Sequence, residues 1–137
     1  MKKNNFHISW FIRDIPRPEG GGGKSNCDWD FIIKKLQRLQ HEDGSVALEF
    51  DNGNEDDDKS LSVHAQNDHY FIVFNDKRDG KHFRRVSFDS ASPYGKYEMQ
   101  GSDWDSRIIF TDYDLVYDVF KQFFETEKIS SPRIAPY

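Results

Sequence analysis

The sequence predicts an α+β domain in which two helices pack on one face of a single antiparallel β-sheet of five to seven strands. Three observations favour this fold: short segments alternate apolar and polar residues, brief turns rich in Gly, Asn and Asp join them, and two longer segments repeat apolar residues every three or four positions. Brief turns indicate antiparallel pairing, because a parallel pair needs a long crossover. A chain of 137 residues can bury one core, so we expect a single domain over residues 1–137.

Alternation of apolar and polar residues predicts the strands. Residues 6–13 begin with this pattern and end nearly all apolar, and residues 45–50 and 61–65 keep it throughout. Residues 69–74 are almost continuously apolar, which is typical of a central strand covered on both faces. A further strand is expected at residues 82–88, and weaker candidates lie at 95–101 and 107–110.

Two segments repeat apolar residues at the spacing of a helix. The first helix is expected over residues 26–41, and Ser25 and Asp28 at its start resemble a capping box. The second is expected over residues 112–126, with aspartates near its start that the helix dipole favours. Its stripe of phenylalanines needs a broad apolar partner, which one face of the sheet provides.

Glycine and proline predict the irregular segments. Two prolines and four consecutive glycines predict a flexible surface loop over residues 14–24, because neither residue type propagates a helix or strand well. Residues 102–103 predict a turn between the weaker strand candidates. The last segment, 130–137, contains two prolines and is expected to be an extended tail.

Composition excludes several classes of function. No apolar stretch approaches the roughly 18 residues of a membrane-spanning helix, and no signal-peptide region is visible, so we expect a cytoplasmic protein with no membrane partner. The net charge, 19 basic minus 24 acidic residues, is −5, which argues against nucleic acid as the partner. The single cysteine, Cys27, can form neither an internal disulfide nor a cysteine-based zinc site.

Two segments resemble cofactor sites but lack the required spacing. Gly23, Lys24 and Ser25 end like a phosphate-binding loop, yet Pro18 stands where that motif needs its first glycine. Calcium-binding loops need a glutamate at position twelve, and counting from Asp51 that position is serine. We therefore predict no metal and no cofactor.

Charge is segregated along the chain, which favours electrostatically steered protein association over catalysis. We call one segment the acidic turn; it lies between two strands and contains Asp51, Glu55, Asp56, Asp57 and Asp58. We call the other the basic hairpin; it contains Lys77, Arg78, Lys81, Arg84 and Arg85. Both segments can simply be solvated, or the acidic turn can face a basic partner while Arg84 and Arg85 hold a partner carboxylate.

Histidines supply an alternative function. Neighbouring strands can bring His64, His69 and His82 together, and histidine is a common general base and metal ligand. A small hydrolase using His64 or His69 with a carboxylate is therefore one alternative, and a scaffold subunit of a larger assembly is another. A scaffold subunit would require an exposed apolar patch.

Several segments together resemble small bacterial immunity proteins of polymorphic-toxin and contact-dependent growth inhibition systems. The resemblance rests on residues 97–107, on the helix 112–126 with its Phe-Phe-x-Thr ending, and on the helix beginning at Trp29 with the following residues 44–48. The sequence departs from the pattern at Glu127, where glycine is often found.

The resemblance implies a non-enzymatic protein that binds the C-terminal domain of a cognate toxin and blocks it. Such toxins are often nucleases, whose basic clefts would attract the acidic turn. Asp56, Asp57 and Asp58 would then mimic phosphates. Trp104, expected on a loop, is either an aromatic anchor for the toxin or a core residue.

Overall fold

The computed structural model describes residues 5–51, 53 and 58–136. Its elements are, in chain order, β1 (Phe6–Ile12), β2 (Gly21–Ser25), α1 (Trp29–Arg38), β3 (Gly44–Phe50), β4 (Lys59–Gln66), β5 (His69–Arg78), β6 (Lys81–Ser87), β7 (Lys96–Met99), β8 (Ser102–Asp105), α2 (Tyr113–Thr126) and β9 (Ile134–Pro136).

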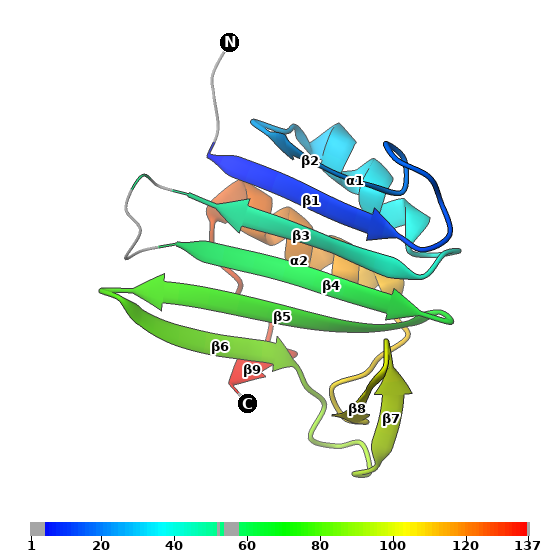
Figure 1. Cartoon of the computed structure of the whole chain (residues 1–137). Coiled ribbons are helices and arrows are strands. Elements are labelled where there is room, and N and C mark those ends of the chain that lie inside the picture. The colour runs from blue at the N-terminus through cyan, green and yellow to red at the C-terminus, as the bar shows by residue number, and fades with distance from the viewer. Residues whose placement is uncertain (1–4, 52, 54–57, 137) are drawn as a thin grey trace.

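Seven strands form one antiparallel sheet in the order β2-β1-β3-β4-β5-β6-β9, and β7 and β8 form a separate hairpin. Both helices lie behind the large sheet in Figure 1, on the same face. This arrangement confirms the predicted α+β fold with two helices on one side of an antiparallel sheet. Neither of the two described helices is long and apolar enough to cross a membrane.

The main core lies between the helices and the sheet. Phe120 and Phe123 of α2 are fully buried, and the Phe123 ring lies edge-on to Phe6 of β1 at 5.5 Å. Ile32 and Leu36 of α1 are buried in the same cluster. The apolar stripes predicted from helical spacing therefore cover the sheet, as large buried rings do efficiently.

Aspartates determine where both helices begin. The Asp28 side chain accepts a hydrogen bond from the backbone N–H of Phe31 at 2.8 Å, and Asp112 accepts one from Asp114 at 3.0 Å. These bonds satisfy N–H groups that a helix start leaves without partners. Because Asp28 is the cap, α1 begins at Trp29 and is shorter than the predicted helix over 26–41.

The β7–β8 hairpin covers part of the opposite sheet face. The ring of Trp104 lies 4.3 Å from that of Phe71 on β5, and Met99 and Ile108 are buried in the same second cluster. Phe71 and its neighbour Ile72 are thus buried on opposite faces of the sheet. Burial on both faces explains why the sequence of β5 is almost continuously apolar.

The hairpin also corrects two predictions. The turn expected at residues 102–103 lies instead at residues 100–101, where both φ angles are positive, 53° and 82°. Residues 107–110 form no strand beyond a single bridge between Phe110 and Tyr70. Four-residue strands carry too little alternation for their ends to be located from sequence.

Part of the segment expected to be a flexible loop over residues 14–24 is instead a strand. β2 pairs with β1 along its whole length and forms one edge of the sheet. A Cβ atom at Gly22 or Gly23 would lie 2.9 Å from ring atoms of Trp10 or His7, respectively. The glycines therefore let two rings of β1 lie directly against β2.

Candidate protein-binding site

The described ends of the acidic turn, Asp51 and Asp58, lie beside the basic hairpin at one end of the sheet. The end of β3, the start of β4 and the β5–β6 turn all lie at the left of Figure 1. The backbone N–H of Lys77 donates to the carbonyl oxygen of Asp58 at 2.8 Å, which joins the last part of β5 to the residue before β4. We call this region, the described residues of 49–60 and 75–84, the charged end. Strand order thus brings together two segments of opposite charge.

A hollow of about 340 Å³ opens at the charged end. Its lining includes Asp51 and Asp58 of the acidic turn and Lys77 and His82 of the β5–β6 hairpin. Side chains of both charge signs therefore face one open space, and a partner surface of mixed charge can contact both. Such complementarity sets the orientation and the association rate of a complex.

The described carboxylates of the acidic turn differ in their surroundings. Asp51 accepts a hydrogen bond from the backbone N–H of Gly53 at 2.8 Å, which stabilises the local turn. Asp58 is half-buried, and its Oδ1 is shielded from water with no hydrogen-bond partner among the described residues. Such an oxygen is unfavourable for the fold, and a partner can bond to it only if this end of the sheet rearranges. The remaining predicted residues lie outside the described part of the chain: Glu55, Asp56 and Asp57.

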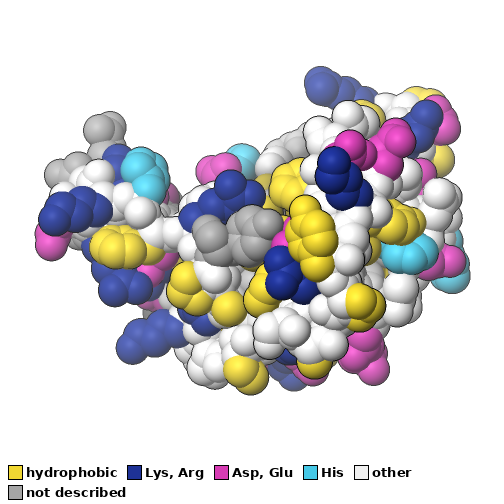
Figure 2. All heavy atoms as spheres, turned by 90° about the horizontal axis from the view of Figure 1, so that it is seen from below, with side chains coloured by type: hydrophobic (Ala, Val, Ile, Leu, Met, Phe, Trp, Pro, Cys, Tyr) yellow, Lys and Arg dark blue, Asp and Glu magenta, His cyan; other side chains and the backbone are white. Residues whose placement is uncertain are grey.

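Basic residues of the hairpin are only partly available to a partner. Arg78 forms an ion pair with Asp76 at 2.7 Å, and this hydrogen bond raises the pKa of the guanidinium. Arg84 is exposed, and it lies opposite Asn75 on the sheet face away from the helices. The lobe that projects at the left of Figure 2 carries several Lys and Arg side chains together with hydrophobic and histidine side chains. Lys77 and Lys81 form no ion pair with any described residue.

Arg85 holds the C-terminal segment. Its guanidinium donates to the carbonyl oxygen of Ile134 at 2.6 and 2.9 Å and to that of Ile129 at 3.0 Å. Because β9 pairs with β6 beside it, Arg85 fixes the last strand of the sheet. The predicted binding of Arg85 to a partner carboxylate would therefore compete with these hydrogen bonds inside the chain.

Asp76 is a residue that the sequence analysis missed. It is 5% exposed, and one of its carboxylate oxygens has no hydrogen-bond partner among the described residues while the other binds Arg78. It continues the inward-facing row of Tyr70, Ile72 and Phe74 on β5. The sequence signal that could have identified Asp76 is a carboxylate at an inward-facing position of a strand.

Trp104 lies on β8 and not on the loop that the sequence predicted. Its ring packs on Phe71, and its Nε1 donates to the carbonyl oxygen of Met99 at 3.3 Å. The half-buried ring is thus part of the second cluster, although its exposed part can still contact a partner.

His64 and His69 lie near the β7–β8 hairpin, each stacked on a different ring. His64 stacks on Phe71 at 4.5 Å and His69 on Tyr97 at 4.9 Å. Burial lowers the pKa of His64, and a hydrogen bond to Gln100 opposes this shift. Neither forms an ion pair with a described carboxylate, and the described residues contain no group of three His, Cys, Asp or Glu placed to hold a metal.

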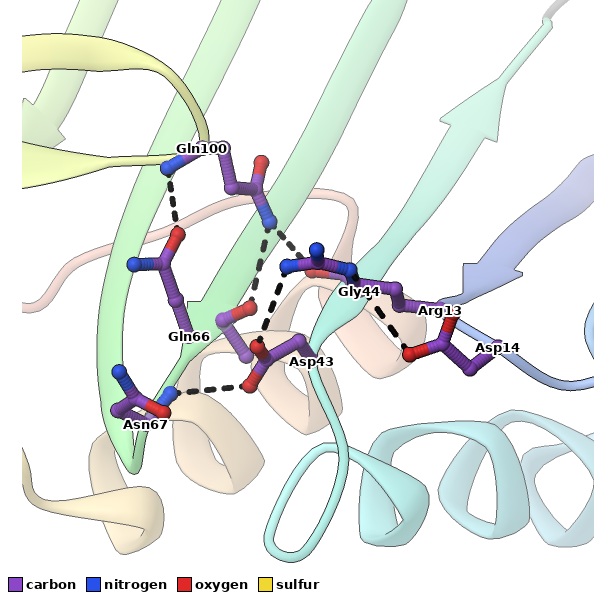
Figure 3. A network of polar contacts seen from close by, with 8 residues as sticks. Arg13, Asp14, Asp43, Gly44, Gln66, Asn67 and Gln100 are labelled. Carbon is purple, nitrogen blue, oxygen red and sulfur yellow. Dashed lines mark hydrogen bonds and ion pairs between the residues drawn. The ribbon is translucent and has the colours of Figure 1, made fainter.

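A polar network joins strand ends at the opposite end of the sheet, which we call the hairpin end (Figure 3). The side-chain amide of Gln100 donates to the carbonyl oxygens of Gly44 at 3.0 Å and Ala65 at 3.3 Å, and its backbone N–H donates to Gln66 at 2.6 Å. One residue of the β7–β8 turn therefore holds the ends of β3 and β4. Its positive φ, an unusual value for glutamine, marks the position in the structure but not in the sequence.

Comparisons with known proteins identify a family and a fold. A family model described as a family of unknown function, DUF6911, matches residues 18–133. Among solved structures, a hypothetical protein from Neisseria gonorrhoeae superposes with a TM-score of 0.64 at 15% identity, covering 96% of this chain and 94% of that one. This likeness shows a shared fold alone. No curated protein matches the sequence.

Proposed function

The chain belongs to the DUF6911 family, whose model covers most of its length, and we propose that it is an immunity protein. In this proposal it binds a cognate toxin domain, with a nuclease as the favoured target, and blocks that domain by occupying its surface. It carries out no reaction of its own. The proposal combines the resemblance of residues 97–107 and 112–126 to immunity proteins with the geometry of the charged end.

The observation that carries the proposal is the hollow between the acidic turn and the β5–β6 hairpin. Asp51, which is exposed, and half-buried Asp58 both line this hollow. A nuclease cleft is basic because it holds a phosphate backbone, so lysine or arginine from such a cleft would pair with these acidic residues. Charge of this kind mainly accelerates association.

Tight binding also needs an apolar contact that excludes water. A nanomolar complex corresponds to about 12 kcal/mol, which charges at an exposed rim do not supply. Phe83 on β6 is 47% exposed, and the guanidinium carbon of Arg78 lies 5.2 Å from its ring centroid. An aromatic ring beside an arginine is the composition of an interface hot spot. Phe83 therefore joins Trp104 as a candidate anchor.

The test uses the C-terminal domain of a toxin encoded next to the gene of this protein. The triple variant Asp56→Asn, Asp57→Asn, Asp58→Asn should lower the association rate by about tenfold at low salt, and high salt should reduce the difference. The matched control removes the same charge elsewhere, at exposed Asp14, Asp68 and Asp118.

Two results would reject the proposal. Equal association rates for the triple variant and its control at both salt concentrations would remove the acidic turn from the interface. Failure of the unaltered protein to bind or inhibit the neighbouring toxin domain would remove the immunity function itself.

A further inference from the structure

The outer edge of β2 carries backbone groups that no strand covers. The hydrogen bonds from Ile12 N–H to Gly20 O and from Asn26 N–H to Phe6 O, both 2.9 Å, bracket the β1–β2 ladder. In an antiparallel pair, bonded and non-bonded residue pairs alternate. Even-numbered residues of β2 therefore bond to β1, and the N–H and C=O groups of odd-numbered residues point away from the sheet.

Two of these odd-numbered residues are open to solvent. Gly23 and Ser25 are exposed, whereas Gly21 is buried and a Cβ atom there would lie 3.3 Å from the Arg17 side chain. No other described residue bonds to the outward backbone groups of Gly23 and Ser25. Together they present two N–H donors and two C=O acceptors at the spacing of a β-ladder, which an extended chain can pair with.

At the opposite edge of the sheet, β9 covers Arg85–Ser87 of β6 and offers no such ladder itself, while residues 81–84 of β6 extend beyond it. β9 has only three residues and ends at Pro136, which has no N–H group to donate. Short edge strands and proline are features that protect a sheet edge from further pairing. β2 lacks both, so the two edges of the sheet are not equivalent.

Two lysines without ion pairs flank β2 on the helix side. The Lys24 ammonium lies 4.4 Å from the ring centroid of Phe31, and the Lys35 ammonium lies 4.2 Å from that of Trp10. Neither lysine forms an ion pair within the described chain. Burial, followed by the nearby Arg38, lowers the pKa of Lys35, so a carboxylate beside it would be favourable. A segment that pairs with β2 would place alternate side chains next to these cations.

The other side of β2 faces an exposed ring. Phe11 of β1 is 57% exposed, and it lies opposite Gly21, which has no side chain to cover it. An apolar side chain of an added strand, placed beside Gly23 on the same face, would extend toward this ring next to the Arg17 side chain, which lies beside Gly21. The surroundings of β2 therefore call for carboxylates on one side of the added strand and apolar residues on the other.

We propose that β2 is a docking strand for an extended acidic segment of another protein, which adds to the sheet as an eighth strand beside Gly23 and Ser25. This surface lies at the top edge of Figure 1, away from β6 and β9, and it does not depend on the toxin proposed above. Pairing of β2 with a second copy of itself is disfavoured, because it would bring Lys24 and Lys35 of both copies together.

The test uses the full chain and a synthetic nine-residue peptide, acetylated and amidated, that alternates glutamate with valine. The peptide should bind, and it should slow amide hydrogen exchange at Gly23 and Ser25, whose N–H groups point outward. The exchange of Gly22 and Lys24, which already bond to β1, should change little. A peptide that alternates lysine with valine should bind at least about tenfold more weakly.

Two variants of Gly23 provide a matched pair. Gly23→Pro removes the outward N–H and leaves the bonds to β1, which use Gly22 and Lys24. Gly23→Ala adds a Cβ at the same place, near His7, but keeps the N–H. Gly23→Pro should weaken the acidic peptide about tenfold relative to Gly23→Ala. If Gly23→Pro does not fold, the double variant Lys24→Gln, Lys35→Gln tests the charge contribution instead, with the same expected loss.

Three results would overturn the proposal. Equal binding of the peptide to the two Gly23 variants would show that backbone pairing at Gly23 does not contribute to binding. Protection that falls elsewhere than Gly23 and Ser25 would place the peptide at another surface. A dimer in light scattering that persists in Gly23→Ala and is lost in Gly23→Pro would mean that a second copy of this chain occupies the edge.

Discussion

The two ends of the sheet differ in what their side chains do. At the hairpin end, Gln100 bonds to the ends of two strands, and Asp43 accepts from the backbone N–H of Asn67 at 3.0 Å. At the charged end, Phe83 and Arg84 of β6 are exposed. Shielded polar atoms with no partner among the described residues occur near both ends, at Asp58 and Asp76 and at the hydroxyl of Tyr113 beside Tyr70, so they do not separate the two. The hairpin end therefore stabilises the fold, while the charged end keeps side chains exposed to a partner.

Removing an aromatic ring at the hairpin end should have the largest effect on stability. Phe71→Ala should lower the free energy of unfolding by about 3 kcal/mol, because the ring is 3% exposed and packs on Trp104. Phe83→Ala at the charged end should change it by no more than about 0.5 kcal/mol. Urea unfolding measures both variants, and similar losses would contradict the contrast between the ends.

Neutralising two adjacent arginines of β6 should show that one stabilises the fold and that the other does not. Arg85→Met should cost about 2 kcal/mol, because the carbonyls of Ile129 and Ile134 lose a charged donor. Arg84→Met removes the same charge from an exposed site and should cost less than about 0.5 kcal/mol. Chemical denaturation of the two variants checks the difference. Equal costs would show that the bonds of Arg85 do not stabilise β9.

Shortening one side chain should loosen the hairpin end without unfolding the domain. Gln100→Asn keeps an amide, and asparagine tolerates a positive φ, but the shorter side chain cannot reach both strand ends. We expect a loss of about 1 kcal/mol and faster amide exchange in β7 and β8. Gln40→Asn, at an exposed position after α1, is the control. Unchanged amide exchange in β7 and β8 would show that Gln100 does not hold the hairpin to the sheet.

Acid should weaken the hairpin end, and this is the smallest expected effect. Burial lowers the pKa of His64 from its usual 6.5, so the unfolded chain takes up the proton first. Stability should therefore fall as pH drops below 6.5, and the fall should stop below the folded-state pKa. Thermal melting between about pH 7.5 and about pH 5 measures this. His64→Phe should reduce the decrease, and an equal decrease in that variant would assign it to other groups.

Much of the fold was predictable because its signals are local. Alternation along β3 and β4 and the stripe of Phe120 and Phe123 each follow from a single element and its period. β2 was not predictable in this way, because glycines carry no alternation and only the rings of Trp10 and His7 show why they are there. Of the β7–β8 hairpin, β7 lies within the weaker strand candidate over residues 95–101, but β8 was missed because it is short and packing on β5 stabilises it.

The candidate site was predictable in composition and less so in arrangement. Charge runs identified both segments, but only the sheet order shows that they meet. Arg84 and Arg85 were treated as equivalent, although consecutive residues of a strand point to opposite faces. That alternation would have separated the exposed arginine from the one beside β9. Asp76 could have been found by the same reasoning, from the inward positions of β5.

The rings packed against β2 restrict which substitutions this segment accepts. At Gly22 a methyl group would press on Trp10, whose Nε1 donates to the carbonyl oxygen of Pro18 at 3.1 Å, so the ring has little room to retreat. Mutational scanning should therefore find little tolerance at position 22 and more at the exposed tip of the β5–β6 hairpin. The glycine run of β2 has the composition of a low-complexity linker, yet it would then be among the segments of the domain that tolerate substitution least.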